Sequence, residues 1–356
     1  MTIQDSVVIV DGARTAVGTY GGAFKATTAH ELAAPAIVAA LERAGVAPDA
    51  VDDVVLGCVG QVGPDAFNAR RAALAAGLPA QTNAYNVNRL CGSGLQALWC
   101  AAMELRLGEC DVAVAGGNEN MTMQPFLDYS ARDGYRLGHR TVVDGTLSLV
   151  TDPWGSYAMG VTAENVAERF HVDRASQDEF AATSQERAAK AAADGVFAAE
   201  IVPVEVADGK GTRTVDVDEH PRASSTVEKL ARLRPAFRED GTVTAGNSSG
   251  INDGAAALVL MREADARAQG LKPKARIVAF AKGATEPEIM GYAPVQAIQR
   301  VIEKSGIPLE NIGIIELNEA FAAQAIACVR AAEMDPDKVN PSGGAIALGH
   351  PVGATG

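Results

Sequence analysis

Three side chains in this sequence, those of Cys91, His350 and Asn318, have the types and surroundings that nucleophilic catalysis needs. Cys91 stands in VNRLCGSGLQALWC, just ahead of an apolar run that is typical of a buried helix. The glycines around Ser93 leave room for a ligand, and the positive end of a helix lowers the pKa of a nearby thiol. We interpret Cys91 as a covalent nucleophile, the alternative being a buried structural thiol.

His350 lies in GGAIALGHPVGATG, the last stretch of the sequence. The glycines and the proline around it predict a tight turn that fixes the imidazole, as a base acting near neutral pH requires. We expect residues 345–348 to form a strand that leads into this turn, with a helix beginning after it. A solvated or packed imidazole is the default for the other histidines, His30, His139, His171 and His220.

Asn318 begins the sequence NEAF, directly after the apolar run 314–317, which we expect to be a strand. Ligands of an α/β sheet bind at the carboxyl ends of its strands, so this side chain would face the site. Its amide could donate a hydrogen bond to an oxyanion, directly or through water. It could also cap the helix that follows, and the sequence alone does not separate these two roles.

The composition excludes several classes of protein. The 356 residues carry a net charge of −13, which argues against a nucleic-acid-binding surface. The five cysteines form no CxxC pair, which argues against a disulfide framework or a zinc site and favours reduced thiols. The sequence has no apolar run of membrane-helix length and no signal-peptide pattern at its start. We therefore expect a soluble, cytoplasmic protein with no membrane or nucleic-acid partner.

Short β-rich runs alternate with alanine-rich helical runs in residues 1–120. This alternation predicts an α/β fold with a mostly parallel sheet that is covered by helices. Glycines at positions 45 and 108 should end the two helices. The expected strands are 7–10, 54–56 and 112–115, and the expected helices are 31–44 and 95–107.

A weak internal repeat relates two parts of the chain. ALERAGVAPDAVDDVVLG at 40–57 matches VIEKSGIPLENIGIIELN at 301–318, in the order helix, glycine, short loop and strand. The offset, 301 minus 40 or 261 residues, carries Cys91 to position 352, inside the turn of His350. We expect two related halves whose equivalent turns meet at one cleft, the alternative being a chance match between two ordinary helix–strand units.

Residues 121–250 break the strand–helix rhythm and read as an insertion that covers the site. We expect an amphipathic helix region over 163–193 within it. The chain should then return to a buried strand at 251–261, and the second half should open with a strand at 275–279.

Two segments of this insertion could contact an extended anionic ligand. Residues 221–238 carry five basic side chains and one acidic side chain, a local charge of +4 in an acidic protein. Arginines suit phosphate groups because they bind them in a bidentate way, although a solvated helix face is the alternative. The sequence TAGNSSG at 244–250 could place backbone groups against the same ligand.

Five motifs, in their order along the chain, resemble the signatures of the thiolase family: VNRLCGSG, AGGNEN, GTVTAGNSSGINDGAA, NEAFAAQ and GGAIALGHPVGATG. The resemblance runs from residue 7 to residue 356. It implies an α/β protein with a duplicated, layered αβαβα fold and an inserted loop domain. The implied parts are a first half at 1–120 and 251–273, a coenzyme A-binding loop domain at 121–250, and a second half at 274–356.

The resemblance implies an acyltransferase that condenses an acyl-CoA with acetyl-CoA, or cleaves a 3-ketoacyl-CoA with coenzyme A. Cys91 matches the nucleophile, and its backbone N–H matches part of one oxyanion site. His350 matches the base, and Asn318 matches the residue that holds an oxyanion-binding water with it. The positions that contact coenzyme A match Arg222, Phe237, Ala245, Gly246 and Ser249. The positions that line the acyl pocket match Met159, Met290 and Phe321.

The same resemblance implies no permanently bound cofactor, because coenzyme A and its thioesters are the substrates. It also implies a homodimer or homotetramer and a place in fatty acid metabolism. Thiolases continue past the equivalent of Gly356 with a segment that carries a second catalytic cysteine, so we expect the working protein to extend further.

Two positions depart from the thiolase pattern. Ala158 stands where short-chain thiolases often have histidine, which argues against acetoacetyl-CoA as a substrate, and Thr355 stands where serine is commoner. Two other functions stay open at this point. One is a thiolase-like binding or scaffold protein without turnover. The other is a condensing enzyme that uses acyl-carrier protein, against which NEAF and the GHPxG histidine argue, because such enzymes place a second histidine in the role of Asn318.

Overall fold

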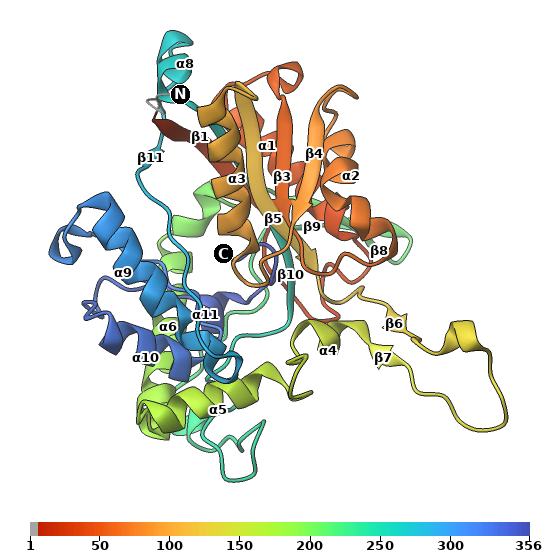
Figure 1. Ribbon diagram of the computed structural model, residues 1–356, viewed down its shortest axis with the longest axis vertical. Helices are drawn as coiled ribbons and strands as arrows, with labels where there is room; N and C mark the ends of the chain where they lie inside the picture. Colours follow the sequence, from red (N-terminus) through yellow and green to blue (C-terminus); the bar gives the residue numbers. More distant parts are fainter. Residues whose placement is uncertain (1–5) are drawn as a thin grey trace.

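A seven-stranded sheet with the order β11-β1-β10-β5-β3-β4, and with β2 paired to β10, forms the centre of the computed structural model (Figure 1). The structure describes residues 6–356. The expected strands at 7–10, 54–56, 112–115 and 251–261 all lie in this sheet and are confirmed. Its strands are β1 (Val7–Arg14), β2 (Gly18–Thr19), β3 (Asp53–Gly57), β4 (Asn83–Val87), β5 (Val112–Asn120), β10 (Asn252–Arg262) and β11 (Ala275–Ile277).

The expectation of a mostly parallel sheet is wrong. β3 lies parallel to β4 and β5, whereas β10 runs antiparallel to β1, β2 and β5, and β11 runs antiparallel to β1. A helical crossover makes neighbouring strands parallel, and here it connects only the strands around β3. β10 instead re-enters the sheet after residues 121–250, and that long excursion sets its direction.

Helices cover both faces of this sheet (Figure 1). α1 (Ala29–Ala44) and α2 (Asn68–Ala75) pack on one face, and α3 (Ser93–Leu107) packs on the other. Successive side chains of a strand point to opposite faces, so Val54 of β3 packs with α1 whereas Val55 packs with α3. The sheet is buried on both sides, which explains why its strands read as continuous apolar runs.

Local residues define the ends of the two predicted helices. α1 ends at Gly45 (φ 67°) and α3 ends at Gly108 (φ 74°), both in the left-handed conformation that glycine adopts without strain. α1 begins after Thr28, whose side chain forms a capping box with Glu31. The helices expected at 31–44 and 95–107 are therefore confirmed.

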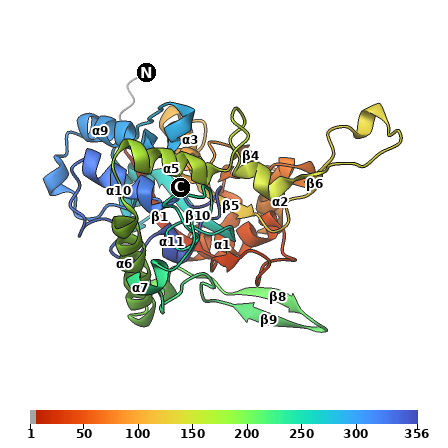
Figure 2. The same ribbon diagram turned by 90° about the horizontal axis from the view of Figure 1, so that it is seen from below.

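Residues 121–250 extend from the body of the protein, and their two hairpins, β6–β7 and β8–β9, project away from it (Figure 2). The region expected as one helix over 163–193 contains two helices, α5 and α6. The break occurs because His171 has a positive φ of 52° and Asp173 caps a new helix start. The elements of this region are β6 (Phe126–Leu127), β7 (Val143–Asp144), α4 (Gly145–Leu149), α5 (Met159–Arg169), α6 (Arg174–Ala193), β8 (Val204–Asp208), β9 (Gly211–Val215) and α7 (Val227–Leu230).

The chain after β11 forms helices that lie against α5 and α6 (Figure 1). These are α9 (Ala293–Ser305), α10 (Ala322–Ala331) and α11 (Ala345–Leu348). Residues 345–348 were expected to form a strand, and that expectation is wrong. The Gly344 carbonyl accepts hydrogen bonds from the N–H groups of residues 347 and 348, at 3.0 and 2.8 Å, which winds the run into one helical turn.

The expected strand at 314–317 is also wrong, because this run pairs only through an isolated bridge between Ile315 and Val339. Ile315 and Leu317 pack into a small apolar cluster, whereas Ile314 is 64% exposed, so the run is covered on one face and β3 on both. Within residues 278–356, the backbone forms isolated bridges and no sheet. The strand expected at 275–279 exists as β11, and it pairs with the first sheet.

The internal repeat is visible in the backbone. α1 ends at Gly45 and is followed by the 3₁₀ turn η1 (Pro48–Ala50). α9 ends at Gly306 (φ 64°) and is followed by the 3₁₀ turn η6 (Leu309–Asn311). Both pairs keep the offset of 261, since 306 minus 45 and 309 minus 48 give the same value. The division into two halves and a loop domain stays a prediction.

The remaining helices are short. None of the helices in residues 6–356 has the length and apolar character that a membrane span requires. The short helices are α8 (Glu263–Ala268), η2 (Gly63–Phe67), η3 (Ala131–Asp133), η4 (Val196–Ala199) and η5 (Pro287–Tyr292).

Candidate active site

Cys91 lies in a tight turn between β4 and α3, just beyond the carboxyl end of β4. Ser93 holds this turn, because its hydroxyl donates to the Leu90 carbonyl at 2.6 Å and accepts from the Arg89 N–H at 2.9 Å. Leu90 has a positive φ of 48°, a conformation that costs a leucine conformational free energy. The turn thus places a half-buried thiol at a defined point before α3.

The turn that carries His350 docks onto the Cys91 turn through glycine backbone. A Cβ atom at Gly356 would lie 2.5 Å from the Cys91 carbonyl oxygen, and one at Gly94 would meet the Gly356 carbonyl. Only glycine allows two backbones to approach this closely. Val352 also packs in one apolar cluster with Cys91. The two turns that the sequence predicts to meet therefore lie side by side.

His350 and Asn318 contact each other. Asn318 Nδ2 lies 3.4 Å from His350 Nε2, and the histidine is 5% exposed. Burial lowers the pKa of His350 to about 4, so the imidazole is neutral near pH 7 and Nε2 can accept the amide hydrogen. His350 Nδ1 and Asn318 Oδ1 are both buried without a hydrogen-bond partner in the described part of the chain. Such atoms mark a place where a substrate group or water can bind.

The alternative role of Asn318, as a helix cap, does not hold. α10 begins at Ala322 with Phe321 as its N-cap residue, so Asn318 precedes the helix start. The NEAF segment instead runs beside residues 246–249, where the Ser249 N–H donates to the Ala320 carbonyl at 3.0 Å. This pairing aims the Asn318 side chain at His350 rather than at the end of a helix.

The pKa of Cys91 differs from the sequence-based expectation. The start of a helix was expected to lower it, but burial raises the pKa of Cys91 to about 11, and the negative charge of Glu119 adds to this effect. That expectation is wrong because the loss of hydration outweighs the field of one helix end. In the resting protein the thiol and the His350 imidazole are both neutral, so the imidazole is free to act as a base.

Glu119, at the end of β5, contacts both the loop that follows β3 and the histidine turn. Its side chain is fully buried and accepts hydrogen bonds from the N–H groups of Val59, at 2.8 Å, and Gly60, at 3.0 Å. Gly353, in the histidine turn, lies against the same carboxylate, since a Cβ atom there would be 2.7 Å from Glu119 Oε2. Burial raises the pKa of Glu119 to about 7 in spite of these donors.

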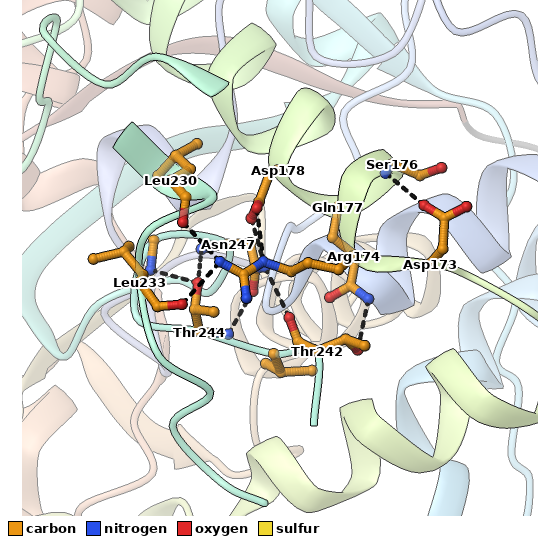
Figure 3. Close-up of polar contacts among 12 residues, drawn as sticks. Asp173, Arg174, Ser176, Gln177, Asp178, Leu230, Leu233, Thr242, Thr244 and Asn247 are labelled. Atoms are coloured by element: carbon orange, nitrogen blue, oxygen red, sulfur yellow. Dashed lines mark hydrogen bonds and ion pairs between the residues drawn. The ribbon is translucent and has the colours of Figure 1, made fainter. Parts of the chain in front are cut away.

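A polar network holds the loop 244–249 on the helices behind it (Figure 3). Asn247 Oδ1 accepts from the Thr244 N–H at 2.7 Å, and its Nδ2 donates to Asp178 Oδ1 at 3.0 Å. Arg174 of α6 contacts the same carboxylate at 2.7 Å and donates to the Leu230 carbonyl at 2.7 Å. The loop is thereby presented on a rigid support. The expected ligand contacts on it are exposed or half-buried: Ala245, Gly246 and Ser249.

Aromatic and methionine side chains gather next to this loop. The rings of Phe237 and Phe321 meet edge to face, with centroids 6.0 Å apart. The Phe237 ring lies against Gly160, which has no side chain to displace it. Met159 begins α5 beside Gly160, and Met290 lies in η5, which packs against α5. These residues lie on neighbouring elements. Four of them are half-buried: Met159, Phe237, Met290 and Phe321.

The basic segment 221–238 presents several cations to solvent. Arg222, Arg232 and Arg234 are exposed and form no ion pair with any described residue. Arg238 instead pairs with Glu168 at 3.5 Å. Exposed arginines without an acidic partner among the described residues are available to pair with the phosphate groups of a ligand.

Comparison with known protein families identifies the family of this chain. The model described as thiolase, N-terminal domain, matches residues 7–264, and the model described as thiolase, C-terminal domain, matches residues 271–356. The chain belongs to the thiolase family. Thiolases with the same layout are found among known sequences and among solved structures.

This thiolase is 48% identical over 352 residues to the acetyl-CoA acetyltransferase of Rhizobium meliloti. The match covers 99% of this chain and 89% of that relative. The crystal structure of the Bacillus anthracis acetyl-CoA acetyltransferase matches with a TM-score of 0.97 and 45% identity, over 99% of this chain and 89% of that one. Human mitochondrial 3-ketoacyl-CoA thiolase matches with a TM-score of 0.95 and 39% identity, over 99% and 90%. The thiolase fold class is therefore confirmed.

Three buried polar residues of the thiolase site were not singled out from the sequence. These are Glu119, Glu319 and Asn252, each of which is at most 1% exposed. Glu319 accepts from Ser184 Oγ at 2.7 Å and from the Ile346 N–H at 3.2 Å, beside the histidine turn. A carboxylate or amide next to a buried apolar strand is the sequence signal that could have found them, because a buried polar group needs partners.

Proposed function

We propose that this thiolase transfers an acyl group from one coenzyme A thioester to a second through a covalent intermediate on Cys91. The observation that carries the proposal is the docking of the His350 turn onto the Cys91 turn, with Asn318 bonded to the same imidazole. A thiol, a neutral imidazole and an amide on adjoining segments are the groups that acyl transfer through a thioester requires.

In the first half-reaction, the Cys91 thiol gives its proton to His350 and the sulfur attacks the thioester carbonyl. A carbon–sulfur bond forms at Cys91, and the bond to the sulfur of coenzyme A breaks. The proton passes from the imidazole to the departing sulfur, so coenzyme A leaves as a thiol. The low pKa of the buried His350, about 4, favours the return of this proton.

In the second half-reaction, the enolate of a second acyl-CoA attacks the acyl-enzyme. A carbon–carbon bond forms and the bond to the Cys91 sulfur breaks. The sulfur leaves as a thiolate and takes up the proton that was removed from the Cα of the second acyl-CoA. Both half-reactions build negative charge on oxygen, where one positioned donor contributes about 3–4 kcal/mol. Asn318 and His350 provide this donor directly or through a water that they hold. The reverse reaction cleaves a 3-ketoacyl-CoA.

Coenzyme A would bind along the loop domain, with its acyl end toward Cys91. The exposed Arg222 suits its phosphate groups, because a guanidinium pairs with phosphate through two hydrogen bonds. The rigid loop 244–249 offers backbone groups to the extended part of the ligand. Contacts to coenzyme A are assigned to Arg222, Phe237, Ala245, Gly246 and Ser249, and contacts to the acyl group are assigned to Met159, Met290 and Phe321.

We propose acetyl-CoA as an acyl donor, because relatives named acetyl-CoA acetyltransferase are 48% and 45% identical to this chain. A relative named beta-ketothiolase is also 48% identical, so the degree of identity does not separate the two names. Condensation with acetyl-CoA and thiolysis of a 3-ketoacyl-CoA are the two directions of one reaction. A cytoplasmic location, a homodimer or homotetramer and a place in fatty acid metabolism stay predictions.

Intact-mass measurement after incubation with acetyl-CoA tests the proposal. The expected result is the gain of one acetyl group, which peptide mapping places on Cys91 and which C91S abolishes. C328S, which removes a buried thiol of α10, serves as the matched control and should keep the adduct. The absence of an adduct, or an adduct on another cysteine, would overturn the proposal.

Two further measurements separate the alternatives. A binding or scaffold protein would take up acetyl-CoA without forming an adduct, and a half-active protein would form the adduct without releasing acetoacetyl-CoA. A condensing enzyme that uses acyl-carrier protein would be acetylated by acetyl-acyl-carrier protein and not by acetyl-CoA. The proposal predicts the adduct from acetyl-CoA, followed by the release of acetoacetyl-CoA when a second acetyl-CoA is supplied.

A further inference from the structure

The backbone of His350 is held by the side chain of a buried amide. Asn252, the first residue of β10, is fully buried, and its Oδ1 accepts a hydrogen bond from the His350 N–H at 2.9 Å. Its Nδ2 donates to the Gly18 carbonyl at 2.9 Å and lies 3.3 Å from His220 Nδ1. One side chain thus connects β2, β10, the segment that precedes Arg222 and the histidine turn.

His220 determines which way this amide points. Its Nδ1 faces Asn252 Nδ2 at 3.3 Å. Burial and the charge of Arg222 lower the pKa of His220, so the ring is neutral near pH 7. A neutral ring that carries its proton on Nε2 leaves Nδ1 as an acceptor. The Gly18 carbonyl and His220 Nδ1 then both require the NH₂ side of the amide, which leaves Oδ1 for His350.

The residues around the Asn252 amide and the His220 ring are tightly packed. Gly349, which precedes the histidine, has φ 100°, and a Cβ atom there would lie 2.6 to 2.8 Å from the Asn252 side chain. A Cβ atom at Gly250 would meet the His220 ring and would lie 2.7 Å from Asn252 Oδ1. The turn is therefore pressed against the amide as well as bonded to it, so a change in the amide displaces the turn.

We propose that Asn252 is the positioning residue of His350, and that His220 fixes the orientation of the Asn252 amide. This proposal rests on the proposed function, in which His350 is the base. Asn252 touches neither substrate nor the reacting atoms; it acts through the backbone of the histidine. His220 joins it to the segment of Arg222, so the support of the base is continuous with the expected coenzyme A-binding surface.

Asn252→Leu tests the role of the amide, with Asn120→Leu as its matched control. Asn120 is also a buried asparagine of this sheet, 1% exposed, and it bonds to the backbone of Phe24, Thr27 and Met123 without touching the histidine turn. Both variants lose three hydrogen bonds of a buried amide. N252L should lower kcat on the order of 10²-fold with KM little changed, because a misplaced base loses about that factor. N120L should lose stability alone.

Histidine NMR titration supplies the readout that a general loss of stability would not move. The chain has five histidines, and the ring signal of His350 is assigned by its absence in H350N. In the wild type this signal should not titrate between pH 5.5 and 8, because the pKa of His350 is about 4. In N252L the displaced ring should reach water, and its pKa should rise toward the ordinary value of about 6.5.

Two substitutions of His220 keep the proposal testable if N252L does not fold. His220→Asn retains an acceptor at the place of Nδ1, whereas His220→Leu does not. H220L should lower kcat and H220N should restore most of it. Equal kcat values for N252L and N120L, an unshifted His350 titration in N252L, or equal loss in H220L and H220N would overturn the proposal. Acetylation of Cys91 in the wild type, measured in the same samples, separates such a result from a failure of the proposed function.

Discussion

Asn318 Nδ2 lies 3.4 Å from His350 Nε2, and the two residues come from segments that meet only in the folded chain. The contact joins the NEAF segment to the histidine turn, which itself docks on the backbone of Cys91. It requires a neutral imidazole, and burial provides one by lowering the pKa of His350 to about 4. The amide and the imidazole each retain one buried polar atom without a partner among the described residues.

Replacement of Asn318 by alanine removes the proposed oxyanion donor. We expect kcat to fall about 10²–10³-fold, the usual cost of losing one such donor, with KM changed little. Steady-state thiolysis of acetoacetyl-CoA measures this effect. Asn311→Ala is the control, because Asn311 is an exposed asparagine of the turn η6. Equal kcat values for the two variants would contradict the role given to Asn318.

The ionisation of Cys91 has a defined direction. Its pKa is raised to about 11, so the thiol keeps its proton at neutral pH and ionises only in strongly alkaline solution. The ultraviolet absorbance of thiolate, taken as wild type minus C91S, should therefore be near zero at pH 7 and should rise above pH 10. A thiolate signal from Cys91 at pH 7 without substrate would show that the helix end outweighs burial.

Gly353 permits the histidine turn to dock. A Cβ atom there would lie 2.7 Å from Glu119 Oε2 and 3.0 Å from the Gly57 carbonyl oxygen. Gly353→Ala should therefore displace the turn, lower kcat, and cost about 1–3 kcal/mol of unfolding free energy. Gly313→Ala is the control, because nothing lies within 4 Å of a Cβ atom at that position. Urea unfolding and kcat together measure both effects, and full activity in G353A would count against the docking.

Glu319 stabilises the segments around the site. Its buried carboxylate accepts from Ser184 Oγ and Asn340 Nδ2, both at 2.7 Å, and from the Ile346 N–H at 3.2 Å. Glu319→Ala leaves these donors unpaired, so we expect the unfolding free energy to fall by about 3 kcal/mol or more. Exposed Glu303, changed to alanine, should alter it by less than about 0.5 kcal/mol. A small change in E319A, measured by urea unfolding, would refute this role.

The sequence predicts correctly those features that depend on residues adjacent in the chain. Gly45 and Gly108 end their helices because glycine alone adopts the required backbone conformation without strain. The glycines around Cys91 and His350 predict turns, the internal repeat predicts that these turns meet, and the structure brings them together. The five thiolase motifs predict that the chain belongs to the thiolase family, and the family models confirm this prediction.

The features that the sequence does not predict depend on distant contacts. The direction of β10 follows from a long excursion, and residues 345–348 become a helix because of hydrogen bonds to one carbonyl. The pKa of Cys91 depends on burial and on Glu119, neither of which its local sequence shows. No neighbouring residue in the sequence indicates a role for Asn252. Its proposed role follows from the hydrogen bond that its side chain accepts from the His350 N–H.

The rate at which acetyl-CoA acetylates Cys91, followed by rapid quench and intact mass in a single turnover, tests the central claim most directly. His350→Asn should slow this step by roughly 10²–10⁴-fold, the range of a general base, while the adduct still maps to Cys91. The same rate in wild type and H350N, or an acetyl group on a different residue, would contradict the pairing of this thiol with this imidazole.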